Sequence, residues 1–205
     1  MNDPLLLFGF ATTPLELLSF LLAVVNVVLN IRLSHWAWLF AIISSAAYGL
    51  VFFNARLYGD MGLQLVFIAV SLWGWYEWLF GRAGGAALAV SRLDSRGLAV
   101  AAGAWVVGFL FLSWFLRAYT DTDVPHADAF LTAGSLVGQA LLSRKKIENW
   151  HVWIGVDVLY VGLYLYKHLT LTAILYAVFV LMAAAGLRAW TRPGSAAAAA
   201  AMVLK

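Results

Sequence analysis

Polar and aromatic residues recur at helical spacing in three otherwise apolar stretches of this sequence. Near residues 150–166 the recurring positions are Trp150, Trp153, Asp157, Tyr160 and Tyr164. Near residues 127–143 they are Asp128, Thr132, Ser135, Gln139 and Ser143. Near residues 57–80 they are Asp60, Gln64, Phe67, Ser71, Gly74 and Trp78. Steps of three and four residues place each set on one face of a helix, so three such faces turned toward each other predict a polar, aromatic cavity.

Asp157 is the sharpest single signal in these stripes. It lies near the middle of its predicted helix, where a charged carboxylate costs about 2.5 to 3.5 kcal/mol to insert into a bilayer. No Lys or Arg falls at a comparable depth in any predicted helix, which argues against a buried ion pair. Three readings stay open: the carboxyl is protonated, Tyr and Ser hydroxyls satisfy it, or its partner is a cationic ligand. An aromatic face such as Trp153 close to a carboxylate suits a flat cationic ring.

A second interpretation gives the stripes a purely structural role. Ser, Thr, Gln and Gly often lie at helix contacts in membranes, each contributing about 0.6 kcal/mol. Gln64 and Gln139 favour the binding role, because a primary amide is a large group to bury for packing alone. Several Trp residues fall toward predicted helix ends, where an aromatic belt at the membrane interface is typical. We assign Trp36, Trp78 and Trp190 to this belt.

The elements that position these residues are predicted to be transmembrane helices. Of the 205 residues, 64% are hydrophobic and 11% are charged, whereas a soluble domain carries about 25% charged residues. Seven apolar runs are long enough to span about 30 Å of hydrocarbon. They lie near residues 15–31, 36–53, 57–80, 97–117, 127–143, 150–166 and 169–190. The predicted fold is an all-α integral membrane domain over residues 1–193, followed by a low-complexity tail over 194–205.

The distribution of Lys and Arg predicts the orientation of this domain. Ten of the thirteen fall on the side that the C-terminus shares, and only Arg56, Arg117 and Lys167 fall on the other side. Basic loops remain in the cytoplasm. We therefore expect the N-terminus outside and the C-terminus in the cytoplasm.

A shift of 115 residues suggests an internal repeat. It brings Trp38 onto Trp153 and Trp75 onto Trp190, and it lays the first three predicted helices over the last three. The fourth helix then acts as a linker that returns the chain to its starting side. The prediction is a 3+1+3 arrangement of two parallel three-helix repeats, a transporter plan in which substrate binds near the midplane between the repeats. The repeats span about 15–80 and 127–190, with the linker helix at about 97–117.

Signatures of enzymes and metal sites are missing from the sequence. There is no HExxH, GxSxG or glycine-rich phosphate loop. The four His residues lie near predicted helix ends on both sides of the membrane, so they cannot converge on one metal, and the chain contains no Cys. We therefore predict neither catalysis nor a metal site.

Two segments resemble the PnuC family of vitamin transporters. Residues 38–78 read WLFAIISSAAYGLVFFNARLYGDMGLQLVFIAVSLWGWYEW, and residues 139–164 read QALLSRKKIENWHVWIGVDVLYVGLY. The first is similar to the family's first-repeat signature and the second to its "Q…RKKIENWxxWIxVDV" segment. The resemblance covers most of the chain, and the block from Gln139 to Asp157 is the more specific part.

The resemblance implies a fold, a function and a set of substrate-binding residues. Family members are bacterial inner-membrane transporters of B-vitamin precursors, most often nicotinamide riboside, with a fold similar to that of SWEET sugar transporters. Transport is expected to be facilitated diffusion, made one-way when a cytoplasmic kinase phosphorylates the vitamin, with no ATP site, coupling ion or cofactor. The positions that match the two motifs are Gln139, Asn149, Trp150, Trp153 and Asp157 in the second and Gln64, Trp73, Trp75 and Tyr76 in the first. With the stripe residues Thr132, Ser135, Tyr160 and Tyr164, these form the predicted substrate site.

Alternative hypotheses stay open for both the substrate and the mode of transport. Nicotinamide riboside and thiamine both carry a positively charged aromatic ring, whereas riboflavin is neutral and is the least natural guest beside Asp157. A proton-coupled carrier that uses Asp157 as its relay, and a receptor or scaffold without transport, are the other hypotheses. The expected partners are the vitamin and the lipid bilayer, with a homo-oligomer left open, and nucleic acid is not expected.

Overall fold

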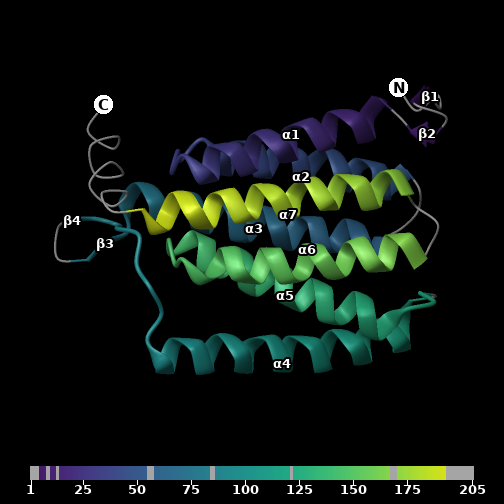
Figure 1. Cartoon of the computed structure of the whole chain (residues 1–205). Helices are drawn as coiled ribbons and strands as arrows, with labels where there is room; N and C mark the ends of the chain where they lie inside the picture. Colours follow the sequence, from purple (N-terminus) through teal and green to yellow (C-terminus); the bar gives the residue numbers. More distant parts are fainter. Residues whose placement is uncertain are drawn as a thin grey trace. The chain divides into compact units, whose positions relative to one another are not determined.

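The computed structural model describes residues 5–7, 10–12, 14–54, 58–83, 86–120, 122–166 and 170–192. Seven α-helices lie within this described part (Figure 1). They are α1 (Pro14–Ile31), α2 (Ala37–Asn54), α3 (Tyr58–Phe80), α4 (Ser95–Tyr119), α5 (Pro125–Ser143), α6 (Glu148–Tyr166) and α7 (Thr170–Thr191). Every boundary falls within two residues of the predicted run. The prediction of seven helices is therefore confirmed for the described residues, because long apolar runs specify helices strongly.

Two short β-hairpins accompany the helices and were not predicted. β1 (Leu5–Leu7) pairs antiparallel with β2 (Phe10–Thr12), and β3 (Arg82–Ala83) pairs antiparallel with β4 (Ala86–Ala87). Strands of two or three residues are too short to show an alternating pattern in the sequence. They do not change the all-α class of the fold.

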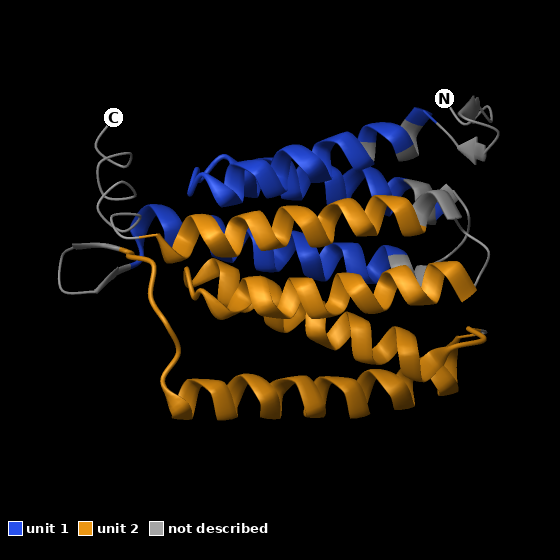
Figure 2. Cartoon of the chain, in the orientation of Figure 1, with its two compact units in different colours: residues 1–87 blue, residues 88–205 orange. Residues whose placement is uncertain are grey.

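The chain divides into two compact units (Figure 2). The first, residues 1–87, contains α1, α2 and α3, with α2 packed against both of the others. The second, residues 88–205, contains the remaining helices, which pack in chain order: α4 on α5, α5 on α6 and α6 on α7. The predicted linker helix α4 therefore belongs to the second unit.

The packing of α4 on α5 depends on one tryptophan and one glycine. The Trp105 Nε1–H donates to the carbonyl oxygen of Phe130 at 2.9 Å, and the rings of Trp105 and Phe130 are 5.1 Å apart. A Cβ at Gly134 would lie only 2.4 Å from the Trp105 ring. The missing side chain of Gly134 is thus what allows the indole to lie against α5.

The turn that follows α1 and the turn that follows α5 have the same backbone structure. Leu33 N–H donates to the Asn30 carbonyl at 3.0 Å, and Lys145 N–H donates to the Leu142 carbonyl at 2.9 Å. Leu33 and Lys145 both have positive φ, at 57° and 51°. A non-glycine residue in this region is uncommon. Two such residues, 112 positions apart and in identical hydrogen-bond patterns, indicate equivalent turns.

The same offset of 112 residues relates two tryptophan pairs. Trp38 meets Trp78 edge-to-face with centroids 5.6 Å apart, and Trp150 meets Trp190 edge-to-face at 5.3 Å. Trp38 lies over Gly74 and Trp150 lies over Gly186, each too close to admit a Cβ. The predicted shift of 115 residues is therefore wrong by about one helical turn. A shift of three residues preserves the hydrophobic face of a helix, so hydropathy alone could not fix the register.

Three helical segments are long and apolar enough to cross a bilayer by length and composition, among the residues described. They are Met61–Phe80, Ser95–Tyr119 and Ala173–Thr191. Phe20–Ile31 and Ala37–Leu50 are shorter apolar helices. The predicted spans at α5 and α6 carry the polar stripes, which lower their mean hydropathy. That is the expected trade-off for helices packed within a bundle.

Candidate functional site

Asp157 lies near the middle of the 19-residue helix α6, and its side chain is only 6% exposed. α5 and α6 contain no Lys or Arg, and Arg188 of α7 is confined to the last turn. The described residues contain no cluster of three His, Cys, Asp or Glu that could hold a metal ion. Near the middle of these three helices, Asp157 therefore has no Lys or Arg as a counter-charge.

The polar stripes of α5 and α6 meet at Tyr160. Its hydroxyl lies close to the side chains of Ser135 and Thr132, which lie one turn apart on α5. Ser135 is buried and uses its own proton to bond the Leu131 carbonyl at 2.9 Å. The structure thus brings together three of the predicted site residues.

Tyr176 on α7 joins this group, and the sequence did not reveal it. Its ring centroid lies 4.8 Å from that of Tyr160 and 5.0 Å from that of Tyr164, and the Tyr160 and Tyr164 rings are stacked. α7 has no polar stripe, so periodicity gave no sign of this residue. The correct offset of 112 would have aligned it with Gln64, which the sequence analysis did single out.

Gln139 and Trp153 lie nearer the start of α6. Gln139 is buried on α5. A Cβ added at the neighbouring Gly138 would lie 3.2 Å from the Trp153 ring. The small residue lets the half-buried indole approach the α5 backbone beside Gln139. Trp153 therefore packs on α5 at the residue next to Gln139.

Two other motif residues have local structural contacts. Asn149 is fully buried and donates from Nδ2 to the Lys146 carbonyl at 2.6 Å, which ties the start of α6 to the preceding turn. Trp150 is 2% exposed and packs on Gly186 and Trp190. Asn149 Oδ1 and Trp150 Nε1 are buried and have no hydrogen-bond partner within the protein. Their assignment to the substrate site stays a prediction.

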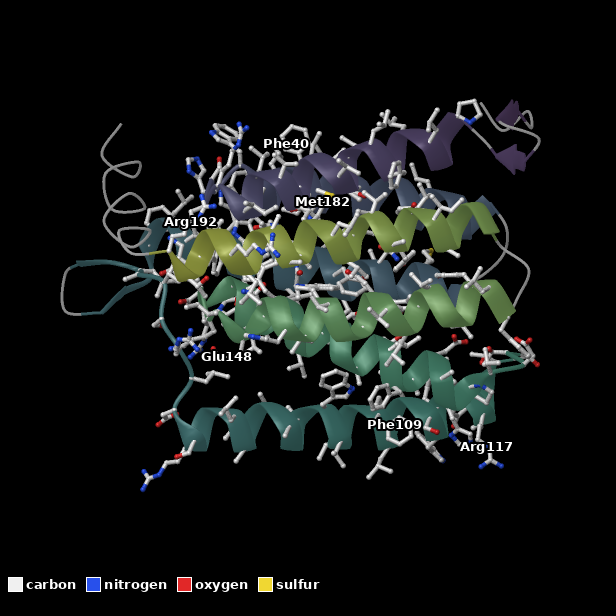
Figure 3. The ribbon with its side chains drawn as sticks, in the orientation of Figure 1. Phe40, Phe109, Arg117, Glu148, Met182 and Arg192 are labelled. Atoms are coloured by element: carbon white, nitrogen blue, oxygen red, sulfur yellow. The ribbon has the colours of Figure 1, made fainter. Side chains whose placement is uncertain are left out.

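The remainder of the RKKIEN motif holds a segment of chain, residues 88–93, that precedes α4. Ser91 N–H donates to the Lys145 carbonyl at 3.1 Å, and Ile147 N–H donates to the Ser91 carbonyl at 3.0 Å. Glu148, at the start of α6 (Figure 3), accepts from Leu93 N–H at 3.0 Å. This network fixes the turn between α5 and α6 to the segment that leads into α4.

Lys145 is the unusual member of this network. Its side chain is 2% exposed, and its Nζ donates to the Leu88 carbonyl at 3.1 Å. Burial lowers the pKa of Lys145 from its usual 10.5 to about 8, because desolvation disfavours the charged form.

The ends of the α5 stripe also have local partners. Thr122 donates to the Asp128 carboxyl at 2.7 Å, near the start of α5. Ser143 is buried and donates to the Ala140 carbonyl at 2.7 Å.

The first unit holds the four other predicted site residues on α3. Gln64 is half-buried next to Gly49 of α2. Trp75 is half-buried beside Trp36, with ring centroids 6.4 Å apart. The side chains of Trp73 and Tyr76 are exposed, and the exposed fraction of Tyr76 is 60%. Gln64 and Trp75 are thus the more enclosed of the four, and the side chain of Asp60 lies outside the described residues.

The predicted aromatic belt is only partly right. Trp36 is 52% exposed, in keeping with an interfacial position. Trp78 and Trp190 are instead buried in the edge-to-face pairs with Trp38 and Trp150. Belt and packing residues share the same helix-end positions in a sequence, so position alone could not separate them.

Comparison with known proteins agrees with these features. A family model described as "Nicotinamide mononucleotide transporter" matches residues 13–192. The riboflavin/roseoflavin transporter RibM of Streptomyces davaonensis is 28% identical over 183 residues, 85% of this chain and 83% of the relative. The nicotinamide riboside transporter PnuC of Escherichia coli is 22% identical over 190 residues, 75% of this chain and 74% of the relative.

A solved structure supports the fold. The crystal structure of the vitamin B3 transporter PnuC aligns with a TM-score of 0.69 at 23% sequence identity, covering 86% of this chain and 80% of the other. The resemblance to PnuC transporters expected from the sequence is confirmed. Both relatives are transporters, which also supports the prediction that the chain is not an enzyme.

Proposed function

The chain belongs to the nicotinamide mononucleotide transporter family, and from this premise we propose that it carries a B-vitamin precursor, nicotinamide riboside, across the bacterial inner membrane. The observation that carries the choice of substrate is Asp157. A buried carboxylate with no Lys or Arg on α5 or α6 is suited to a positively charged guest. The pyridinium ring of nicotinamide riboside supplies that charge, together with a flat face for Trp153 or the tyrosines.

The proposed mechanism is facilitated diffusion with alternating access. The equivalent turns and tryptophan pairs support a plan of two parallel three-helix repeats, α1–α3 and α5–α7, joined by α4. Substrate favours exchange between states only if the occluded state holds it better than the open ones. Phosphorylation by a cytoplasmic kinase then traps the vitamin. The excess of Lys and Arg on one side favours a cytoplasmic C-terminus.

Riboflavin is the second candidate substrate. The 28% identity with a riboflavin/roseoflavin transporter over most of both chains favours it. Its ring is neutral, so Asp157 would serve it as a hydrogen-bond acceptor rather than as a counter-charge. Thiamine shares the ring charge of nicotinamide riboside and is distinguished from it only by measurement.

A ligand screen tests the substrate. Purified protein is heated with nicotinamide riboside, thiamine or riboflavin, and a ligand that binds the folded state raises its melting temperature. We expect the largest rise with nicotinamide riboside. A rise with riboflavin alone would move the assignment to the second candidate, and no rise with any of the three would contradict the proposed function.

An uptake assay tests the transport mode. Cells that express the protein take up labelled nicotinamide riboside with and without the cytoplasmic riboside kinase. Facilitated diffusion predicts accumulation only when the kinase is present. Accumulation that needs no kinase and stops when the ion gradient is collapsed would indicate a coupled carrier, with Asp157 as the candidate proton relay.

A further inference from the structure

Three tyrosines form a continuous aromatic surface next to Asp157. Tyr160 and Tyr164 follow Asp157 at positions three and seven along α6 and therefore share its face of the helix. Tyr176 approaches from α7 and touches both rings, with centroid distances of 4.8 and 5.0 Å. Phe179, one turn further along α7, supports Tyr176 edge-to-face at 5.7 Å. We call Tyr160, Tyr164 and Tyr176 the tyrosine cluster.

Polar side chains of the protein lie close to two hydroxyls of the cluster. Ser135 and Thr132 lie near the Tyr160 hydroxyl, and Tyr164 lies near that of Tyr176. What the cluster has left to offer a ligand is the faces and edges of its half-buried rings. The negative face of an aromatic ring attracts a cation and gives a neutral ring of the same shape no such advantage.

The position of Asp157 adds to this preference. Asp157 lies one turn before Tyr160 on the same face of α6, and Tyr176 packs on Tyr160 from α7. A carboxylate and several aromatic faces together make the kind of site that binds quaternary and heteroaromatic cations. Tyr176 is the residue that connects the two, because it contacts both tyrosines of α6.

From this geometry we propose that Tyr176 contacts the substrate ring and makes the transporter selective for a ring that carries a positive charge. The proposal rests on the proposed function, since it concerns the same site. It assigns charge selection to a residue outside both sequence motifs. It also implies that the reduced, uncharged dihydropyridine form of nicotinamide riboside is discriminated against although its ribose and amide are the same.

Binding titrations of purified protein with nicotinamide riboside and with its reduced form test this proposal. We expect wild type to prefer the charged form and Tyr176→Phe, which keeps the ring, to keep that preference. Tyr176→Leu and Tyr176→Met remove the ring, and each is expected to weaken binding of the charged form by about three- to thirty-fold. The affinity for the reduced form should change by less than about twofold, which is the size of effect expected from a substitution that removes no specific interaction.

The controls separate a ligand contact from a packing contact. Tyr166→Leu makes the same change at a tyrosine that is 72% exposed and has no place in the cluster, so it should leave both affinities unchanged. Equal losses for both ligands in a folded Tyr176→Leu or Tyr176→Met variant, or no loss for either, would overturn the proposal. If wild type binds neither riboside, the proposed function itself fails, which is a distinct outcome.

Discussion

Gly186→Ala is expected to destabilise the protein by forcing Trp150 out of its place. A Cβ at residue 186 would lie 2.6 Å from three carbons of the Trp150 ring. Ordinary carbon contacts are about 3.5 to 4.0 Å, so the indole must withdraw by roughly 1 Å. Trp190 lies edge-on beside Trp150, with centroids 5.3 Å apart, and Trp190 is itself buried. Overpacking of this kind costs about 1 to 3 kcal/mol.

The assay is thermal unfolding of the purified protein. For a chain of this size, 1 kcal/mol corresponds to about 2 to 4 °C in melting temperature. Gly162→Ala is the matched control, because a Cβ there meets nothing within 4 Å. The control also measures the gain in helix propensity, about 1 kcal/mol, that any Gly→Ala change brings. We expect Gly186→Ala to melt several degrees below Gly162→Ala.

A double variant sharpens the argument. Trp150→Phe places a smaller ring over Gly186, so Gly186→Ala should cost less in that background, and the two changes should not be additive. Gly74→Ala should repeat the effect in the first unit, since its Cβ would lie 2.4 Å from Trp38. Equal melting temperatures for Gly186→Ala and Gly162→Ala would refute the close packing described.

Two further predictions concern the turn between α5 and α6. Burial lowers the pKa of Lys145 to about 8, so the unfolded chain binds more protons than the folded one between pH 8 and 10.5. The free energy of unfolding therefore rises with pH in this range, by on the order of 3 kcal/mol from this group. Lys145→Met should flatten that rise in melting curves, and an unchanged slope would contradict the pKa shift. Glu148→Ala removes the acceptor of Leu93 N–H and should lower the free energy of unfolding by about 1 to 3 kcal/mol, measured by thermal unfolding. Glu148→Gln keeps an acceptor and should cost less. Equal losses for the two variants would contradict the role of Glu148 as this acceptor.

The sequence predicted the helices and the central site residues through different signals. Long apolar runs fixed all seven helix positions, because only helices satisfy their backbone within an apolar segment. The stripe around Ser135, Asp157 and Tyr160 came from helical periodicity, and in the structure Tyr160 does contact Ser135. Local spacing along one helix is information that a sequence carries directly.

Contacts between helices were harder to predict. Tyr176 lies in an apolar helix without a polar stripe. Its place in the site is seen only from the contacts of its ring with those of Tyr160 and Tyr164. The roles of Trp78 and Trp190 depend on which glycine or ring lies opposite, which periodicity does not specify. The repeat offset was missed for the same reason, since one helical turn leaves the hydrophobic face unchanged.

Titration of nicotinamide riboside into wild type and Asp157→Asn tests the central claim most directly. Asn keeps the size of the side chain and an acceptor oxygen but removes the negative charge. If Asp157 is the counter-charge of the substrate ring, affinity should fall at least about tenfold, or 1.4 kcal/mol, while the variant stays folded. A folded Asp157→Asn protein that binds nicotinamide riboside as tightly as wild type would contradict the account.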